Sequence, residues 1–538
     1  MRTSTRPAKV GKLSIALPAV FSMIGCLLSE MKMVSLRFLR GALLLSILFS
    51  NLTVHAVDQF VYTNNDIQGT NKVLGFRVGA DGSLSEIAGS PFPTAGSGDD
   101  GLSFFASNRI VVSASGKFLY ASNSGSNDVS AFSIDPSSGN LTPVPGSPFP
   151  LDSSGPSSGG ISLAVTPDGR FLMAGNPLAE RITSFSIGAD GALTAMRGSP
   201  FFAGGQPAGM KASPNGKFLA VALLGGVAMF GIAPDGSLAA VPGSPFGQGG
   251  VGAAAGVDMN CRGNVLFAGE ANASRITIVD VFSIAPDGVL VPITGSPFVA
   301  EAGANSNVAL LSPDERLLFV SNQEAITLPS STSTVTAFNV AADGTLTLIP
   351  GSPFPAGGFP SGMATNPAGT LLFTANDQAV GVLSIGINGT LTPVPGSPFS
   401  AAQPFSSVKS LAAFPSKTCD IPVDIDIKPG GARNSINLRS KGVVTVAVLS
   451  SASFNPLDVI VDTVRIAGAS PVKFTHKDIN SDGVADLVLH FRTQDLQLKS
   501  NSTELTLTAK LRDGRSITGT DSVRILARNR KDRPKELE

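Results

Sequence analysis

The chain has 538 residues, 39 basic and 39 acidic side chains, and a formal net charge of zero. This balance leaves no polybasic surface for nucleic acid or for an anionic membrane. Glycine (59 residues) and proline (38) are abundant while 43% of the residues are hydrophobic, which is typical of turn-rich β structure and excludes extensive disorder. The length predicts more than one domain.

Residues 1–56 have the character of an export signal region. From Met31 the sequence reads MKMVSLRFLRGALLLSILFSNLTVHA, in which a basic segment precedes a short apolar run and small residues. This pattern is typical of a cleavable secretory signal, and the apolar run is too short to span a membrane comfortably. We therefore expect translation to start at Met31 or Met33, and an exported protein, periplasmic or extracellular, with no transmembrane span in the mature chain. A second, weaker signal ends at Cys26 and leaves lipidation of that cysteine as the alternative.

Residues 57–416 contain an internal repeat. The tetrapeptide Gly-Ser-Pro-Phe occurs seven times, at spacings of 45 to 57 residues. A period of this length indicates stacked structural units, and seven units of short strands predict an all-β fold, a seven-bladed β-propeller. The copies begin at Gly89, Gly146, Gly198, Gly243, Gly295, Gly351 and Gly396.

Each repeat contains four strand-like segments, A to D, separated by Asp-Gly or similar turns. The predicted propeller begins with FVYTNN at residues 60–65, which matches a B segment, and a matching A segment follows the last GSPF at residues 407–415. We expect these two segments to pair and close the ring, because closure removes exposed sheet edges. The phenylalanine of each GSPF is expected to pack between blades.

The composition changes after the last repeat, where glycine falls and charged residues rise. We expect a linker at residues 417–422, a smaller β-sandwich-like domain at residues 423–527, and a charged, disordered tail at residues 528–538. Two cysteines remain after processing, Cys261 in the fifth blade and Cys419 in the linker. We expect both to be free thiols, because two cysteines do not make a disulfide framework.

The predicted C-terminal domain contains a candidate calcium loop with a D-x-N-x-D-G-x-x-D pattern. Alternating oxygen-bearing side chains on a tight turn are the ligands that calcium prefers. The candidate ligands are the side chains of Asp478, Asn480, Asp482 and Asp486 and the carbonyl of Val484. The alternative is an Asx-rich turn without metal. The calcium would have a structural role, and we expect no cofactor in the propeller.

The ends of the B segments are candidates for a ligand-binding face, where an unknown protein or small ligand would bind. Five of the seven segments end in asparagine; the alternative is that each asparagine starts a turn by bonding its own backbone. The five are Asn65, Asn123, Asn176, Asn322 and Asn376.

One B segment ends instead in Glu270, and Arg275 follows it closely. A carboxylate and a guanidinium on this face would suit a general base and an oxyanion partner. The alternative is a surface ion pair of little consequence. The three histidines, His55, His476 and His490, lie outside the predicted propeller, which excludes a histidine-based acid, base or metal site there.

The repeat GkfLYasN…vsaFsId…GnLtpvpGSPF resembles the lactonase seven-bladed propeller family, which includes bacterial 6-phosphogluconolactonases and carboxymuconate cyclase. It is also similar to YVTN-repeat proteins, as in Val61-Tyr62-Thr63-Asn64. The resemblance covers residues 57–416 and implies lactone hydrolysis. Family enzymes have a strand that ends Asn-Glu, and Glu270 is the plausible match here, although it stands at the Asn position and not after it. The family's Gly-Pro-Arg-His stretch corresponds here to residues 252–256, GAAAG, which contain neither arginine nor histidine. The C-terminal segment IDIKPG…NSINLRSKGVV…DLVLHFRT looks like a module of exported bacterial proteins. We therefore expect a non-catalytic binding or interaction scaffold, with a lactone hydrolase as the alternative.

Overall fold

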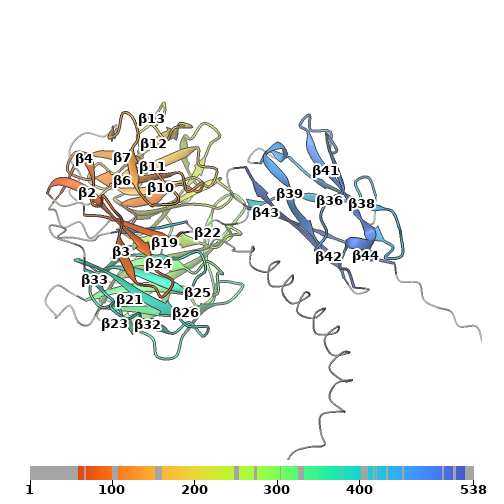
Figure 1. Cartoon of the computed structure of the whole chain (residues 1–538). Coiled ribbons are helices and arrows are strands. Elements are labelled where there is room, and N and C mark those ends of the chain that lie inside the picture. The colour runs from red at the N-terminus through yellow and green to blue at the C-terminus, as the bar shows by residue number, and fades with distance from the viewer. Residues whose placement is uncertain are drawn as a thin grey trace, which may run out of the picture. The chain divides into compact units, whose positions relative to one another are not determined.

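The computed structural model describes most of the chain after the predicted signal region (Figure 1). The described residues are 58–65, 68–99, 107–151, 160–223, 225–247, 254–271, 276–302, 304–324, 333–376, 378–400, 410–415, 419, 421–431, 434–450, 454–499, 502–512 and 516–526. The predicted export signal, the start codons, Cys26 and the charged tail lie outside them. Within these ranges, no helix has the length and apolar character that are needed to cross a membrane.

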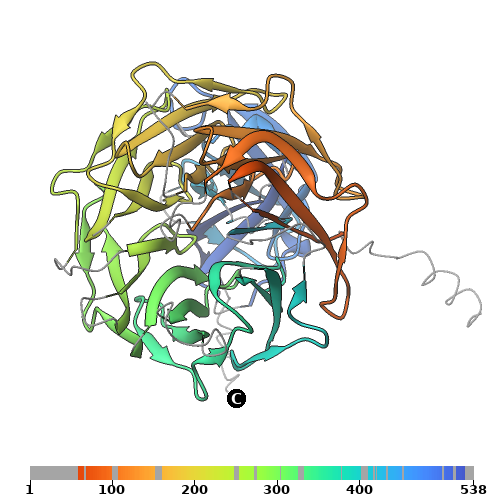
Figure 2. The ribbon, with the colours of Figure 1, turned by 90° about the vertical axis from the view of Figure 1, so that its left-hand side faces the viewer.

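Seven β-sheets in the described residues form the blades of a propeller around a central axis (Figure 2). Each blade begins with an inner strand A, and every inner strand lies beside those of the two adjacent blades. The inner strands of blades 1 to 7 are β34 (Ser410–Phe414), β5 (Ile110–Val112), β10 (Ser162–Val165), β15 (Pro207–Ala212), β19 (Ala254–Met259), β24 (Ala304–Leu311) and β29 (Pro360–Thr365). The propeller predicted from the repeat is therefore confirmed.

Strands B and C continue each blade outward in antiparallel pairing, and they contain much of the buried apolar core. The B strands are β1 (Phe60–Asn64), β6 (Phe118–Asn123), β11 (Phe171–Asn176), β16 (Phe218–Leu223), β20 (Val265–Ala271), β25 (Leu317–Glu324) and β30 (Leu371–Asn376). The C strands are β2 (Gly69–Val78), β7 (Asp128–Ile134), β12 (Arg181–Ile187), β17 (Gly226–Ile232), β21 (Ile276–Ile284), β26 (Thr334–Val340) and β31 (Ala379–Ile385).

The outer edge of strand C is shared by two short strands, where the sequence predicted one. Strand D pairs with the end of C, and a further strand E, which starts at the phenylalanine of GSPF, pairs with its beginning. The D strands are β3 (Leu84–Glu86), β8 (Leu141–Pro143), β13 (Leu193–Ala195), β18 (Leu238–Ala240), β22 (Leu290–Pro292), β27 (Leu346–Leu348) and β32 (Leu391–Pro393). The E strands are β4 (Phe92–Gly98), β9 (Phe149–Pro150), β14 (Phe201–Phe202), β23 (Phe298–Ala302), β28 (Phe354–Pro355) and β33 (Phe399–Ser400), with a single bridge at Phe246 in blade 4.

The GSPF repeat is the connection between strands D and E. In blade 2, the Ser147 hydroxyl accepts a hydrogen bond of 3.0 Å from the amide of Ala131 in strand C, and the serine amide donates to the carbonyl of Val144. The Ser-Pro peptide bond is cis in all seven copies. Phe149 packs in a cluster that combines residues of blades 2 and 3, which confirms the expected packing role of this position.

The ring closes as expected between the two ends of the propeller sequence. Strand β34 pairs antiparallel with β1, so that Phe60 lies opposite Phe414 and Asn64 opposite Ser410. The first blade is completed by the last strand, which leaves no unpaired inner edge at the junction.

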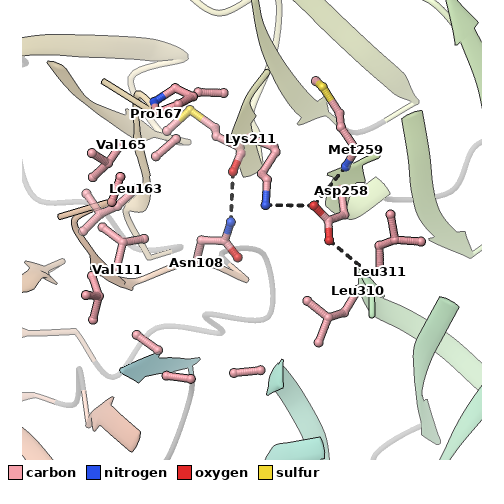
Figure 3. Close-up of a pocket in the computed structure, with 18 of the residues that line it drawn as sticks. Asn108, Val111, Leu163, Val165, Pro167, Lys211, Asp258, Met259, Leu310 and Leu311 are labelled. Atoms are coloured by element: carbon pink, nitrogen blue, oxygen red, sulfur yellow. Dashed lines mark hydrogen bonds and ion pairs between the residues drawn. The ribbon is translucent and has the colours of Figure 1, made fainter. Parts of the chain in front are cut away.

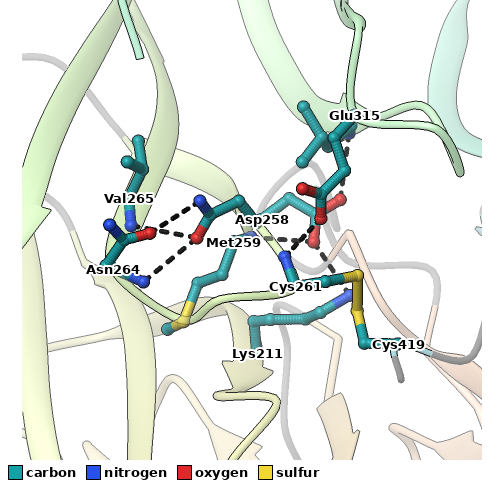
Figure 4. The surroundings of a disulfide bond; sticks show 10 residues. Lys211, Asp258, Met259, Cys261, Asn264, Val265, Glu315 and Cys419 are labelled. Carbon is teal, nitrogen blue, oxygen red and sulfur yellow. Dashed lines mark hydrogen bonds and ion pairs between the residues drawn. A yellow bond between two sulfur atoms is a disulfide. The ribbon is translucent and has the colours of Figure 1, made fainter. Parts of the chain in front are cut away.

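The expectation of two free thiols was wrong. Cys261 and Cys419 form a disulfide whose Cα atoms are 5.1 Å apart (Figure 4). This distance lies within the range that a disulfide requires. The two cysteines are 158 residues apart in sequence. The ring brings them together, because strand β34 returns the chain to the inner layer just before Cys419.

The C-terminal residues form a small β-sandwich-like domain, as expected. One sheet has the order β35 (Ile421–Pro422), β43 (Ser516–Ser522), β42 (Glu504–Leu511) and β39 (Val459–Ile466). The other has the order β36 (Ile425–Ile427), β38 (Val443–Val448), β41 (Asp486–Arg492) and β40 (Lys473–Lys477). A short pair, β37 (Ser435–Ile436) and β44 (Arg524–Ile525), and two 3₁₀ turns, η2 (Pro456–Asp458) and η3 (Thr493–Asp495), complete it. Alternate residues of β42 are buried, and both large sheets contribute to one apolar core.

Candidate functional site

The central channel of the propeller contains a cavity of about 280 Å³ (Figure 3). All seven inner strands contribute to its wall, and most of the lining residues are aliphatic, such as Val111, Val165 and Leu310. The cavity therefore combines a mainly aliphatic set of side chains with several polar groups, which is the general character of a small-molecule site.

One ion pair lies in the wall of this cavity. The Lys211 ammonium in β15 is 2.8 Å from a carboxylate oxygen of Asp258 in β19. Asp258 is almost completely buried, and its other oxygen accepts a hydrogen bond of 2.9 Å from the amide of Leu311 in β24. This carboxylate therefore joins the inner strands of blades 4, 5 and 6. Neither residue was predicted from the sequence as part of a site, although a charged side chain within a predicted inner strand is a feature that the sequence displays.

The five candidate asparagines are all buried, with between 0% and 6% of their surface exposed. Asn123 shows the arrangement best: its amide donates to Asp128 (2.5 Å) and Ser130 (2.8 Å) of strand C, and its oxygen accepts from Asn71 (2.8 Å). The partners of the other four are also protein groups: Lys72 for Asn65, Asn127 and Ala179 for Asn176, Thr334 and Thr336 for Asn322, and Ala356 for Asn376.

One of these bonds is local, as the turn alternative requires: the side-chain oxygen of Asn176 accepts from the amide of Ala179, three residues on. That of Asn65 accepts from the amide of Lys72, seven residues on, across the connection between strands B and C. The asparagines thus bond to protein groups near the end of strand B, and a role in ligand binding stays a prediction.

Glu270 lies at the end of β20 with only 4% of its surface exposed. Its carboxyl group is hydrogen bonded to that of Asp280, which lies diagonally across the sheet on β21. Burial, followed by the charge and the hydrogen bond of Asp280, raises the pKa of Glu270 to about 8. Burial also raises the pKa of Asp280, whose carboxylate accepts from Ser296 of the GSPF repeat at 3.4 Å. Both shifts favour a proton held between the two carboxyl groups. Arg275, the predicted partner of Glu270, lies outside the described residues.

The candidate calcium loop is an ordered turn between β40 and β41. Asp478 accepts hydrogen bonds from the amides of Ser481 (2.7 Å) and Gly483 (3.0 Å), and Asp482 accepts from that of Val484 (2.8 Å). The last bond, followed by that from Asn480, lowers the pKa of Asp482.

Asp486 is fully buried, and its oxygens accept from the amides of Ser450 and Ile479. The donor set suits calcium, which takes carboxylate and carbonyl oxygens. In the described structure, the carboxylate oxygens of Asp478, Asp482 and Asp486 do not all lie within 4.8 Å of one another. Calcium binding would therefore require these oxygens to move closer together.

The model of the family described as lactonase, 7-bladed beta-propeller, matches residues 51–150 and 151–230. A crystal structure of a suspected 6-phosphogluconolactonase from Bacteroides fragilis has a TM-score of 0.52 and 21% identity, covering 67% of this chain and 99% of its own. A second such protein, from Bacteroides uniformis, has the same TM-score and 18% identity, covering 66% of this chain and 99% of its own. No curated protein sequence matches the chain. Residues 60–414 therefore form a seven-bladed propeller with the fold of these two structures, and the lactonase family model matches its first part.

Proposed function

We propose that this lactonase-type propeller is an exported, non-catalytic scaffold that binds a partner protein or a small ligand. In this proposal the C-terminal domain is a structural module that calcium stabilises through the loop of Asp478, Asn480, Asp482, Val484 and Asp486. The observation that carries the proposal is the environment of Glu270, which is the catalytic candidate closest to the pattern of the lactonase family.

A general base must be ionised and within hydrogen-bond reach of the substrate proton. Glu270 is buried, and its carboxyl group is already hydrogen bonded to Asp280. Its raised pKa keeps the pair protonated at neutral pH, so that the proton-accepting form is a minor species. These features suit a structural carboxyl pair inside a blade better than a base at a substrate.

The charges in the central cavity support the same conclusion. Lys211 is paired with Asp258, and Asp258 in turn is bound by the amides of Met259 and Leu311. A phosphorylated sugar acid requires unpaired positive charge for steering and binding. The apolar wall favours a smaller, less charged ligand or no substrate at all.

Lactone hydrolysis is the second candidate, and one observation favours it. A carboxyl group whose pKa is raised to about 8 lies near the range of an acid–base catalyst. The two Bacteroides structures with the same fold are named as suspected 6-phosphogluconolactonases.

Hydrolysis assays distinguish the two functions. We expect the wild type and Glu270→Gln to hydrolyse 6-phosphogluconolactone and simple γ- and δ-lactones at the same rate as buffer. Asp280→Asn, which changes the other member of the pair, is the matched control for effects on folding. Turnover by the wild type that Glu270→Gln abolishes, with an unchanged melting temperature, would establish the hydrolase in place of the scaffold.

A further inference from the structure

The turn between strands A and B follows a common pattern in blades 2 to 7, from which the neighbouring blades 5 and 6 each depart at one position. Its second position is proline in four blades and alanine in blade 2, but it is Cys261 in blade 5. Its fourth position is glycine with φ between 65° and 71° in five blades. In blade 6 that position is Glu315, which has the same left-handed backbone with φ of 61°.

The two departures contact each other. The amide of Cys261 donates a hydrogen bond to the Glu315 carboxylate, a bond that a proline at this position could not make (Figure 4). A left-handed conformation is less favourable for a residue with a side chain than for glycine. Strain of this kind that persists at one position of a repeat points to a function of the side chain.

Cys419 brings a third group to the same point. The sulfurs of Cys261 and Cys419 and a carboxylate oxygen of Glu315 all lie within 4.8 Å of one another, and all three residues are half-buried. In the part of the chain that the structure describes, no other group of three cysteine, histidine, aspartate or glutamate side chains is gathered in this way.

We propose that Cys261, Cys419 and Glu315 form a redox-dependent zinc site. In the oxidised state the two sulfurs are bonded to each other. An external dithiol supplies two electrons and two protons, breaks the S–S bond to give two thiols, and becomes a disulfide itself. Zn²⁺ then displaces the two thiol protons and forms two Zn–S bonds, with a Glu315 oxygen as third ligand and water as fourth.

The chemistry and the geometry of the group both suit this metal. Thiolates are soft ligands that select zinc, and a tetrahedral site with three protein ligands and one water is a common zinc arrangement. The Cα atoms of the cysteines are 5.1 Å apart, and each residue follows an inner strand, so the sulfurs stay neighbours after reduction. Cys419 also lines the cavity of the central channel, which provides space beside its sulfur for the ion and the water. The site joins two propeller residues to Cys419 of the linker, and it does not depend on the proposed scaffold function.

Metal titration of the full chain tests the proposal. The protein is reduced with a phosphine under nitrogen, and Co²⁺ is added as a spectroscopic probe, followed by Zn²⁺ in competition with a chromophoric chelator. We expect one equivalent of metal, with a thiolate-to-cobalt charge-transfer band, in the reduced protein. The oxidised protein and Cys261→Ser should lack this band and this equivalent, and Cys261→Ser also measures metal bound elsewhere in the chain.

The decisive variant is Glu315→Gly, which restores the residue of the other blades and should fold at least as well as the wild type. We expect it to bind Zn²⁺ roughly tenfold or more weakly, since one ligand is lost. Asp314→Asn, on the same turn but outside the group, should bind as the wild type does. The proposal is wrong if the reduced wild type takes up no more metal than Cys261→Ser, or if Glu315→Gly binds zinc as tightly as the wild type.

Discussion

The Tyr62 hydroxyl in blade 1 donates a hydrogen bond of 2.7 Å to the carbonyl oxygen of Gly139 in the C–D turn of blade 2. Tyr120 makes the corresponding bond to Gly191 of blade 3 at 3.3 Å, and Ser184 makes it to Gly236 of blade 4 at 2.9 Å. Blades 1 to 4 are thus joined in succession by a hydroxyl in strand B or C and a turn carbonyl in the next blade. The only two tyrosines of the chain both have this role.

Replacing Tyr62 with phenylalanine should lower the free energy of unfolding by about 1–2 kcal/mol, because the turn carbonyl loses its buried donor. Tyr120→Phe should cost less, since its bond is longer. Urea unfolding of both variants measures the difference. Equal stability of Tyr62→Phe and the wild type would show that the bond contributes nothing.

Glu270 makes the stability of the propeller depend on pH. Its pKa is raised from 4.5 to about 8 in the folded protein, so between these values the folded chain binds more protons than the unfolded chain. The contribution of Glu270 to stability should therefore be greatest below the lower value and should fall as the pH rises toward 8.

Glu270→Gln removes the ionising group while keeping its size, and it should flatten this dependence and stabilise the protein at pH 8 by on the order of 3 kcal/mol. Urea unfolding across this pH range measures the slope. A wild-type curve that is flat there, or a variant curve with the same slope, would contradict the shared proton.

Calcium should raise the melting temperature of the C-terminal domain, because a ligand that binds only the folded state stabilises it by mass action. Asp482→Ala should lose the response, since Asp482 is an exposed member of the loop. Asp495→Ala, an exposed aspartate outside the loop, is the control and should keep it. Differential scanning calorimetry of the full chain with and without calcium gives the shifts, and no shift in the wild type at millimolar calcium would exclude the site.

The last inner strand should be essential for the propeller. A chain that ends after Gln403 lacks β34 and leaves β1 with an open edge, so it should unfold in much less urea than a chain that ends after Pro415. Both lack the C-terminal domain, so the comparison isolates the strand. Similar midpoints for the two would mean that the pairing of Phe60 with Phe414 is not needed for closure.

The structural elements that repeat could be predicted from the sequence, whereas those that occur once or are very short could not. Seven copies of GSPF identify the blades and the closure partner, because each copy occupies the same place in a periodic structure. Strands such as Phe149–Pro150 are only two residues long and have no hydrophobic alternation, so the sequence contains no pattern that predicts them. The asparagines were visible at the B-strand ends, but their burial depends on partners such as Asn71 in another blade.

The disulfide and the Lys211–Asp258 ion pair could not be predicted from the sequence, because both contacts depend on how the blades are arranged. Cys261 and Cys419 meet only because the ring closes, and no local spacing encodes that contact. Lys211 and Asp258 lie on adjacent inner strands, and their pairing depends on the register of two different blades. Cys261 and Glu315 differ from the residues that most blades have at the same turn positions, so a position-by-position alignment of the repeats identifies them.

The pairing of β34 with β1 places both ends of the propeller sequence at one A–B turn. Phe414 ends strand A and Phe60 begins strand B opposite it, so a short linker between them would rebuild the seventh turn of this type. The point at which the chain enters the ring is therefore one of seven equivalent positions. We expect circular permutants opened at another A–B turn, such as that before Phe171, to assemble the same ring. In these permutants strand A of the first blade would be joined to strand B by the linker.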